Sequence, residues 1–290
     1  MRNILVTGGT GTWGQEIVRQ LLVKKSTKRV VIYSRAERSQ EYMKRKVKDK
    51  RVEYILGDVL DYDKVCNSLK GIDTVFHTAA IKAVPNMEQD CMYGFDINVW
   101  GTHNVIRASV ENSVKRFVYV STDKAVAPIN AYGVSKAAAE HIIKQIARDN
   151  PKMNIKIVRS GNVLGSSSSV LQIWKDSLTK SNELKITVSE MTRFFITIED
   201  AVYGLFQAFK QKPLVQANLS KHATLHMLAQ IAKKLWGNNY SKVEYIGNRG
   251  NEKLHEQILS VFDGGEDVFS SSTEKYEFNE LLEIIRNEGI

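Results

Sequence analysis

The chain has few cysteines, and its apolar stretches are short. Only two of its 290 residues are cysteines, Cys66 and Cys91, and they lack the spacing of metal ligands. We therefore expect no metal site and two free thiols in a reducing compartment, the cytoplasm. No stretch approaches the roughly 18–20 uninterrupted apolar residues that a membrane-spanning helix requires. A signal peptide is also not expected, because no charged leader and long apolar segment open the chain.

The charge of the chain is strongly positive, with a formal net value of +9. Much of the visible clustering of basic residues falls in "KRKVKDKR", residues 44–51. This run could contact nucleic acid or form a solvated helix end. Because no aromatic or glycine-rich pattern accompanies it, we favour the helix end and expect no nucleic-acid partner. Part of the excess charge would also suit an anionic cofactor or substrate.

Short β-rich runs alternate with longer helical patterns. The runs are "NILVT" (3–7), "RVVIYS" (29–34), "RVEYILGD" (51–58), "TVFHTA" (74–79), "RFVYVST" (116–122) and "IKIVRSGNV" (155–163). This alternation predicts βαβ units and a buried parallel sheet. With 43% hydrophobic residues, the chain can bury a large core. We predict an α/β fold, a Rossmann-type doubly wound parallel sheet with a smaller C-terminal lobe.

A glycine-rich loop, "VTGGTGTWG" (6–14), follows the first predicted strand and opens a helical pattern. Gly8, Gly11 and Gly14 have the spacing G-x-x-G-x-x-G. Glycines at such positions permit a tight turn and let the backbone approach a pyrophosphate at the helix N-terminus. Between a strand and an amphipathic helix, the pattern indicates dinucleotide binding rather than a merely tight turn.

The second predicted strand ends without the acidic residue that usually binds the ribose of NAD. Ser34 and Arg35 stand at that place, in "IYSRAER". A guanidinium suits a 2′-phosphate, so we expect NADP rather than NAD, the alternative being a surface arginine at a strand end. Asp58, in "GDV" after the third strand, either contacts adenine or caps a helix.

The pattern of strands and helices loosens after about residue 165. We predict that residues 1–165 form an NADP-binding Rossmann domain that carries the catalytic residues. Residues 166–263 would form a smaller substrate-binding lobe, with some chain returning to the Rossmann core. Residues 264–290 are expected to be a polar, poorly ordered tail that ends in a short helix.

A tyrosine and a lysine, Tyr132 and Lys136, lie four residues apart in "YGVSK". A helix places them on one face. The lysine and an oxidised nicotinamide nearby would lower the pKa of the tyrosine from about 10 towards working pH. Tyr132 could then take a proton from a hydroxyl while hydride leaves the same carbon.

These features resemble an extended short-chain dehydrogenase/reductase. Its motifs occur in the family's order: "TGGTGTWG", "GDV", "HTAA", "DINVWGT", "VSTD" and "YGVSK". Within that family the chain is most similar to the inverting UDP-N-acetylglucosamine 4,6-dehydratases of polysaccharide biosynthesis. The segments that carry this similarity are "STDKAVAPINAYGVSK", "IYSRAE", "AAIKAVP", "EMTRFFIT" and "EKLHE". Retaining 4,6-dehydratases usually have Asp-Glu in place of Asp123-Lys124, and 4-epimerases lack the pair.

The resemblance implies a reaction and a set of catalytic residues. Tyr132 and the cofactor would oxidise C4 of the sugar, which acidifies the proton on C5. We assign Lys124 to that proton and Asp123 to the departing C6 hydroxyl, with the reverse assignment also open. A lysine in this role must be neutral for part of the cycle, so we expect a depressed pKa. The catalytic residues that the resemblance implies are Thr122, Asp123, Lys124, Tyr132 and Lys136.

The resemblance also implies cofactor and substrate contacts. The cofactor residues would be Gly8, Thr10, Gly11, Thr12, Trp13, Gly14, Ser34, Arg35, Asp58, Val59, Ala79, Ala80, Lys82, Asn98, Tyr132 and Lys136. Asn98 either serves there or is a packing residue. The substrate residues would be Lys82, Asn162, Arg193, Arg249 and Glu252. The two arginines are candidates for the UDP diphosphate, because guanidinium groups bind it through paired hydrogen bonds.

Several substitutions depart from the family pattern on the expected substrate side. Ser160 and Ser167 replace a tyrosine and an arginine, Ala83 replaces a histidine, and "RGNEKLHE" lacks a proline and a glycine. UDP-glucose or another UDP-hexose therefore stays open as the substrate. A 4-epimerase or 4-reductase and a non-catalytic NADP-binding module are the competing functions. The resemblance also implies a homo-oligomer.

Overall fold

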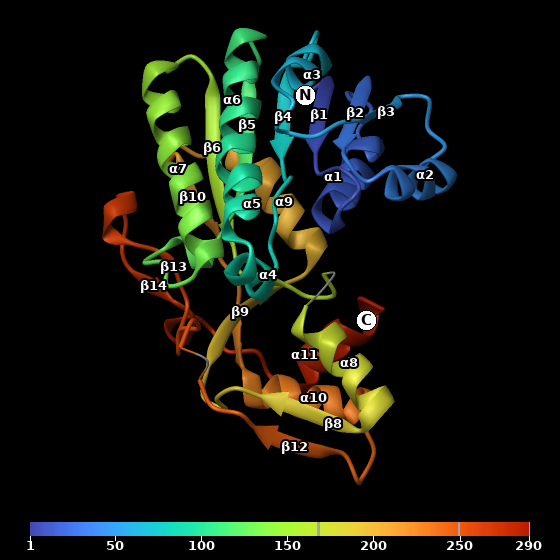
Figure 1. The fold of residues 1–290 in the computed structure, drawn as a ribbon, viewed down its shortest axis with the longest axis vertical. Coiled ribbons are helices and arrows are strands. Elements are labelled where there is room, and N and C mark those ends of the chain that lie inside the picture. The colour runs from blue at the N-terminus through green and yellow to red at the C-terminus, as the bar shows by residue number, and fades with distance from the viewer. Residues whose placement is uncertain (167–168, 249, 290) are drawn as a thin grey trace. The chain divides into compact units, whose positions relative to one another are not determined.

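The structure is a computed structural model that describes residues 1–166, 169–248 and 250–289. The chain forms two compact units (Figure 1). The first unit contains residues 1–121, 131–159 and 202–216. The second unit contains residues 122–130, 160–201 and 217–290. The chain thus passes between the units several times. The predicted domain division placed its first boundary near residue 165 and expected some later chain to return to the Rossmann core.

The first unit is built on a seven-stranded sheet with the order β10-β6-β5-β4-β1-β2-β3. Its strands are β1 (Asn3–Thr7), β2 (Arg29–Ser34), β3 (Val52–Leu56), β4 (Thr74–His77), β5 (Arg116–Thr122), β6 (Asn154–Ser160) and β10 (Val215–Asn218). The strands from β3 to β5 in this order pair in parallel. The order reverses beside β1, so the carboxyl ends of β1 and β4 form the switch point at which such sheets bind ligands.

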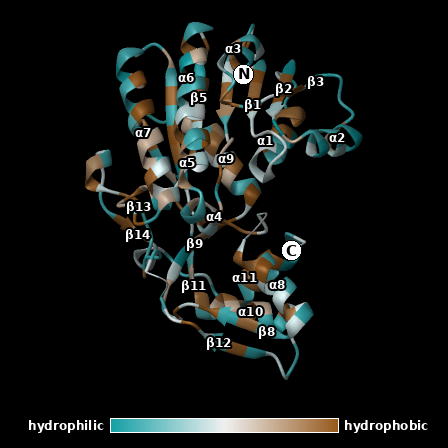
Figure 2. Ribbon diagram, in the orientation of Figure 1, coloured by the Kyte–Doolittle hydropathy of each residue, from teal (hydrophilic) through white to brown (hydrophobic). Residues whose placement is uncertain are grey.

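The central strands are apolar because helices cover the sheet. The helices of this unit include α1 (Thr12–Val23), α2 (Glu37–Lys46), α3 (Tyr62–Ser68), α4 (Val84–Gln89), α5 (Cys91–Phe95), the π-helix η1 (Asp96–Gly101), α6 (Thr102–Glu111), α7 (Ala131–Asp149) and much of α9 (Ile198–Ala208). One layer contains α3, α6 and α7, which pack in that order. Lys24 lies over the Phe206 ring, which places the end of α1 beside α9. Figure 2 shows hydrophobic colour on β1 and β4 and alternating colours along α7, as amphipathic packing requires.

The second unit has its own hydrophobic core. Its elements include η2 (Asp123–Ala125), β7 (Asn162–Val163), α8 (Val170–Ser181), β8 (Glu183–Ile186), β9 (Thr192–Ile196), β11 (His222–Thr224), α10 (Leu225–Trp236), β12 (Lys242–Tyr245), β13 (Gln257–Leu259), η3 (Val261–Asp263), β14 (Val268–Phe269), η4 (Ser270–Ser272) and α11 (Phe278–Asn287). The core contains Trp174, Leu228 and Phe195, each almost fully buried. Three small sheets, β11-β9-β7, β12-β8 and β13-β14, complete the unit.

The predicted α/β fold with a doubly wound, Rossmann-type sheet is confirmed. The polar segment from residue 264 contains β14 and η4 and ends in helix α11. Helix α11 buries Leu281, Leu282 and Ile285 in the core of the second unit, so residues 278–287 are part of that core. Among the described residues, no helix is long and apolar enough to cross a membrane.

Candidate active site

The glycine loop lies between β1 and α1, where the backbone must pass close to a neighbouring segment. Gly8 has a φ of +65°, and a Cβ built on it would lie 2.7 Å from the backbone nitrogen of Ala79. A Cβ on Gly14 would lie 2.4 Å from the Cα of Gly9. Both positions therefore require glycine, the first for its conformation and both for space. The loop thus packs tightly against residues 78–79 and against the first turn of α1.

The N-terminus of α1 offers backbone N–H groups to a ligand. Gly11 is the N-cap residue and provides no side-chain cap. Its own N–H is bound by the carbonyl of Gly8 at 2.9 Å. The first N–H groups of a helix otherwise lack partners and attract anions. Thr12 and Trp13, the first helical residues, lie where the cofactor contact is predicted.

Arg35 follows β2 directly and extends towards Asp58. Its guanidinium lies 3.8 Å from the Asp58 carboxylate and also bonds the hydroxyl of Tyr93. The Arg35 side chain remains 43% exposed, so it can still meet a phosphate. Ser34, in contrast, is buried, and its hydroxyl accepts a hydrogen bond from Gln40. Of the two predicted residues, Arg35 is the one that is available to a ligand.

Asp58 does not cap the helix that follows. Asp61 caps α3 by accepting a hydrogen bond from the backbone of Lys64. Asp58 instead accepts from the backbone N–H of Leu60 at 3.0 Å, in a turn. The next residue, Val59, is buried. The capping alternative is therefore wrong for Asp58, and the adenine contact stays a prediction.

Asn98 fixes the loop that follows β4 and includes the predicted residues Ala79, Ala80 and Lys82. It is fully buried in the π-helix η1. Its Oδ1 accepts from the backbone of Ile81, and its Nδ2 donates to Ile81 and to the Ser135 hydroxyl. Both ends of the amide are thus occupied by protein contacts. These contacts favour the packing alternative over a direct cofactor contact.

Lys136 lies on α7, one turn after Tyr132, and points at the end of β5. Its ammonium donates to the carbonyl of Val120 at 2.7 Å and lies over the Tyr119 ring, 4.0 Å from its centroid. Burial lowers the pKa of Lys136 to about 7, although the charge of Glu140 opposes this shift. A buried lysine near neutrality responds strongly to any charge that forms nearby.

A buried ionic network holds α7 against β5 and β6. Arg159 of β6 binds the Glu140 carboxylate through two bonds, of 2.9 and 2.7 Å. Ser121 donates to the same carboxylate at 2.6 Å. Paired contacts of this kind fix a helix in orientation as well as in distance. The network therefore holds the turn of α7 that carries Lys136.

Asp123 and Lys124 lie in the second unit, in the short helix η2 that follows β5. Asp123 is fully buried, and its Oδ1 accepts from the Thr122 hydroxyl at 2.9 Å and from the Lys124 ammonium at 3.1 Å. The same ammonium nitrogen lies 3.5 Å from the carboxylate of Glu256. The predicted pair, Asp123 and Lys124, is thus in direct contact, and the carboxylate of Glu256 lies beside Lys124 as well.

The expectation of a depressed pKa for Lys124 is wrong for this state of the protein. Burial alone would lower the pKa, but the charges of Asp123 and Glu256 outweigh burial and raise it. Lys124 therefore carries its proton here. Burial raises the pKa of Asp123, and the charge of Glu256 raises it further.

Arg193 is buried inside the second unit rather than exposed to solvent. It donates to the backbone carbonyls of Thr192 and Leu254 and lies 3.8 Å from the carboxylates of Glu252 and Glu256. Its contacts hold the segment at residues 251–256 against β9. Asn162 lies in β7, beside β9. Arg249 and Ser167 lie outside the described residues.

Two charged residues close to Asp123 and Lys124 were not predicted as site residues. Glu256 contacts Lys124, and Lys253 donates to the carbonyl of Val126 in the same loop as Asp123. Both belong to the segment "EKLHE", residues 252–256, from which Glu252 alone is predicted as a site residue. Three charged residues lie within these five positions, and the sequence gives no sign of which would face the pair.

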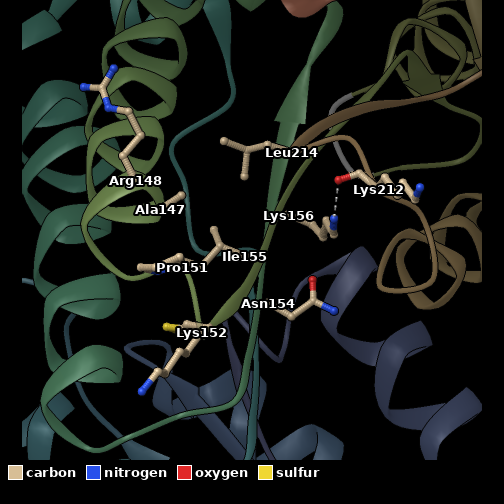
Figure 3. Close-up of a pocket in the computed structure, with 10 residues that line it drawn as sticks. Ala147, Arg148, Pro151, Lys152, Asn154, Ile155, Lys156, Lys212 and Leu214 are labelled. Atoms are coloured by element: carbon tan, nitrogen blue, oxygen red, sulfur yellow. Dashed lines mark hydrogen bonds between the residues drawn. The ribbon is translucent and has the colours of Figure 1, made fainter.

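A separate cavity of about 420 Å³ lies in the first unit (Figure 3). Its lining includes Arg148, Lys152, Lys156 and Lys212. The cavity lies around the turn before β6, at the amino end of that strand. Lys156 donates to the carbonyl of Lys212, and the charged ends of Arg148 and Lys152 point in different directions. These side chains do not converge on one point, so the cavity is not the candidate active site.

Comparison with known proteins agrees with the fold and the motifs. The family described as polysaccharide biosynthesis protein matches residues 4–276. A protein of Rickettsia bellii named UDP-glucose 4-epimerase is 35% identical over 266 residues, covering 89% of this chain and 78% of its own. A protein of the same name from Rickettsia akari is 33% identical over 269 residues, covering 90% and 79%.

Solved structures share the whole fold. The structure of Pen from Bacillus thuringiensis has a TM-score of 0.91 and 28% identity, over 99% of this chain and 97% of its own. DesIV of Streptomyces venezuelae, a dTDP-glucose 4,6-dehydratase solved with NAD and TYD, has a TM-score of 0.83 and 21% identity, over 99% and 96%. The latter similarity concerns the fold alone. The chain belongs to the polysaccharide biosynthesis protein family of extended short-chain dehydrogenases/reductases.

Proposed function

We propose that the protein is an NADP-dependent nucleotide-sugar 4,6-dehydratase that acts on UDP-N-acetylglucosamine with inversion at C5. The product would be a 4-keto-6-deoxy sugar. The observation that carries this proposal is the buried contact between Asp123 and Lys124. Dehydration across C5 and C6 needs both a base and an acid. Simple oxidation and reduction at C4 needs neither residue.

The first unit supports NADP as the cofactor. The close approach at Gly8 and the uncapped N-terminus of α1 suit a pyrophosphate. Arg35 suits a 2′-phosphate because its guanidinium remains partly exposed at the end of β2. When bound, NADP would accept hydride from C4 of the sugar and return it to C6.

Tyr132 is the proposed base for the C4 hydroxyl. Lys136 assists it because its ammonium, held at the end of β5, favours the phenolate form of the neighbouring tyrosine. A phenolate that forms nearby would in turn favour the proton on Lys136, whose pKa is about 7 in this state. Oxidation at C4 therefore couples the two groups.

Lys124 and Asp123 are the proposed base and acid for the elimination. Lys124 carries its proton at rest, so it must lose that proton before it can take one from C5. The bond of 3.1 Å to Asp123 Oδ1 provides the route. One proton transfer along it makes Lys124 a neutral base and Asp123 a protonated acid for the C6 hydroxyl. Asp123 can accept this proton because burial disfavours its ionised form.

The decisive experiment is incubation with UDP-N-acetylglucosamine in deuterated water, followed by proton NMR. We expect a new C6 methyl signal, a 4-keto product or its hydrate, and deuterium at C5. The C5 coupling pattern then reports inversion or retention. If only UDP-glucose gives the methyl signal, the reaction stands and the sugar changes. If no methyl signal forms with any UDP-hexose although NADP binds, the proposal of a dehydratase fails, and a binding module replaces it when no C4 epimer forms either.

A 4-epimerase is the second candidate, because curated relatives at 33–35% identity carry the name UDP-glucose 4-epimerase. The same experiment separates the two. An epimerase would convert UDP-N-acetylglucosamine to UDP-N-acetylgalactosamine, or UDP-glucose to UDP-galactose, without a methyl signal. The buried Asp123–Lys124 pair would then have no chemical task.

We further propose that the protein acts as a homo-oligomer in the cytoplasm. Its two cysteines, Cys66 and Cys91, are free, as suits a reducing compartment. Light scattering after gel filtration would test the assembly, and a monomer at micromolar concentration would contradict it.

A further inference from the structure

Five charged side chains of the second unit form one buried cluster, which we call the acid–base cluster. Its members are Asp123, Lys124, Arg193, Lys253 and Glu256. All five side chains are at most 20% exposed. The cluster holds two carboxylates, of which only Asp123 has a place in the proposed reaction. The role of the other, Glu256, needs an explanation, because removing a charge from water is costly.

The two carboxylates differ in the cations that face them. Glu256 lies 3.5 Å from Lys124, 3.8 Å from Arg193 and 3.8 Å from Lys253. Asp123 contacts Lys124 alone among these cations. Each carboxylate has one buried oxygen without a hydrogen-bond partner in the described part of the chain, Asp123 Oδ2 and Glu256 Oε2, so the difference lies in the facing cations. A carboxylate that faces three cations stays ionised, whereas a buried one that faces a single cation gains more from a proton. The geometry therefore makes Glu256 the permanent anion and Asp123 the group that can exchange a proton.

The backbone around Glu256 is fixed, so its carboxylate is held in place. The Glu256 N–H donates to the Ser270 hydroxyl at 3.0 Å, and its carbonyl accepts from the Ser270 N–H at 2.7 Å. Two further bonds join residues 251–256 to the loop that carries Asp123. Lys253 donates to Val126 at 2.5 Å, and Asn130 donates to Asn251 at 3.2 Å.

We propose that Glu256 is a positioning residue, the fixed counter-ion of Lys124, which holds the Lys124 ammonium beside Asp123 and keeps the proton of that pair in place. Glu256 need not touch the substrate to do this. Its negative charge acts on both members of the pair at once. It favours the charged form of Lys124 and the neutral form of Asp123, so it increases the proton affinity of both.

The directions of the pKa shifts agree with these roles, in which Glu256 stays ionised and Asp123 exchanges a proton. Burial opposes the charge of Glu256, but Lys124, Arg193 and Lys253 outweigh it and lower the pKa of Glu256. Glu256 in turn helps to raise the pKa values of Asp123 and Lys124. A further charged group near the cluster is Glu252, 3.8 Å from Arg193.

The consequence is a pH window. Proton transfer within the pair requires that Asp123 and Lys124 share one proton, so the pair works between the pKa values of the two groups. Removing the charge of Glu256 lowers both values and moves the whole window to lower pH. An opposite or like charge at this distance typically shifts a pKa by roughly 1–3 units. A residue that only stabilised the fold would lower activity without moving the window.

The first test reads Lys124 directly and needs no substrate, so it is independent of the proposed function. Wild type, Glu256→Gln and Glu256→Asp are labelled with acetic anhydride over a range of pH, and Lys124 acetylation is measured by peptide mass spectrometry. In Glu256→Gln we expect Lys124 to become reactive at a pH lower by roughly 1–3 units. Glu256→Asp keeps the charge and should remain nearer to wild type. Equal profiles for wild type and Glu256→Gln, or a profile of Glu256→Asp displaced as far as that of Glu256→Gln, would overturn the proposal.

The second test rests on the proposed function and uses the pH profile of kcat/KM for dehydration. The acid limb should report ionisation of Asp123, and in Glu256→Gln it should move to lower pH. Glu274→Gln is the matched control, because it removes the same charge from an exposed site, where the carboxylate forms an ion pair with Lys221. A uniform loss of activity in Glu256→Gln, with the limb unmoved, would assign Glu256 a purely structural role. If no dehydration occurs in wild type, the proposed function fails while the labelling result still decides the role of Glu256.

Discussion

The Lys136 ammonium donates a hydrogen bond to the backbone carbonyl of Val120 over 2.7 Å. This bond ties the first turns of α7 to the end of β5. The bond satisfies one of the three donors of the ammonium but does not neutralise its charge, so burial still lowers the pKa of Lys136 to about 7. The group is therefore poised between its two forms at neutral pH.

Replacing Lys136 should change how stability depends on pH. Between about pH 7 and about pH 10 the unfolded chain binds the lysine proton and the folded chain does not, so this group makes stability rise with pH. Lys136→Met removes that slope. Urea unfolding at several pH values should show wild type gaining stability relative to Lys136→Met as pH rises through this range. Lys180→Met, at an exposed position of α8, should show no such trend. A constant difference between wild type and Lys136→Met would mean that Lys136 is charged in the folded protein.

Gly8→Ala should destabilise the protein and abolish NADP binding. The left-handed backbone alone costs an alanine about 1–2 kcal/mol, and the Cβ would also lie 2.7 Å from Ala79. Gly71→Ala is a matched control, because Gly71 has a similar φ of +74° but open space around its Cβ. Thermal unfolding should show a larger loss for Gly8→Ala, and fluorescence titration should show NADP binding only in the control. Equal losses in both variants would mean that the loop adapts to a side chain at position 8.

Arg35→Gln should reduce the preference for NADP over NAD. A charge-assisted hydrogen bond is worth roughly 1.5–3 kcal/mol, which corresponds to about a 10- to 150-fold change in affinity. Calorimetric titration should show this loss for NADP and little change for NAD. Arg45→Gln, at an exposed site in the last turn of α2, should bind both cofactors as wild type does. If Arg35→Gln weakens NAD and NADP equally, Arg35 does not read the 2′-phosphate.

Most of the sheet could be predicted because its strands are short, apolar and bounded by turns. The runs "NILVT" and "RVVIYS" coincide with β1 (Asn3–Thr7) and β2 (Arg29–Ser34). The run "IKIVRSGNV" instead divides into β6 and β7, with Gly161 between them. A Cβ on Gly161 would lie 2.3 Å from Phe194, so close packing against β9 fixes this break. Such a tertiary contact leaves no local signal.

The site was predicted less completely than the fold. The spacing of Tyr132 and Lys136 and the adjacency of Asp123 and Lys124 are visible in one short segment. Glu256 lies far along the chain, and β13 and β14 bring its backbone to Ser270. Its partner charges come from η2, β9 and the loop before β13, so no sequence window contains the acid–base cluster. For the same reason, the raised pKa of Lys124 could not be predicted from its sequence neighbours.

Asp123→Asn should separate oxidation from elimination. An asparagine keeps an oxygen that can accept from Thr122 and Lys124, as Asp123 does, so the position of Lys124 should be preserved. It cannot accept the Lys124 proton or donate one to the C6 hydroxyl. We expect the rate of methyl formation to fall by about 10²–10⁴.

The reduced cofactor provides the readout that identifies the blocked step. In Asp123→Asn, oxidation at C4 should proceed while elimination stalls, so NADPH absorbance should accumulate in a single turnover. Tyr132→Phe should block oxidation itself and give no NADPH. A 4-epimerase would behave differently, because Asp123→Asn would still form the C4 epimer at a rate near that of wild type. Accumulated NADPH without a methyl signal would therefore support the dehydratase, and an undiminished methyl signal would remove Asp123 from the elimination step.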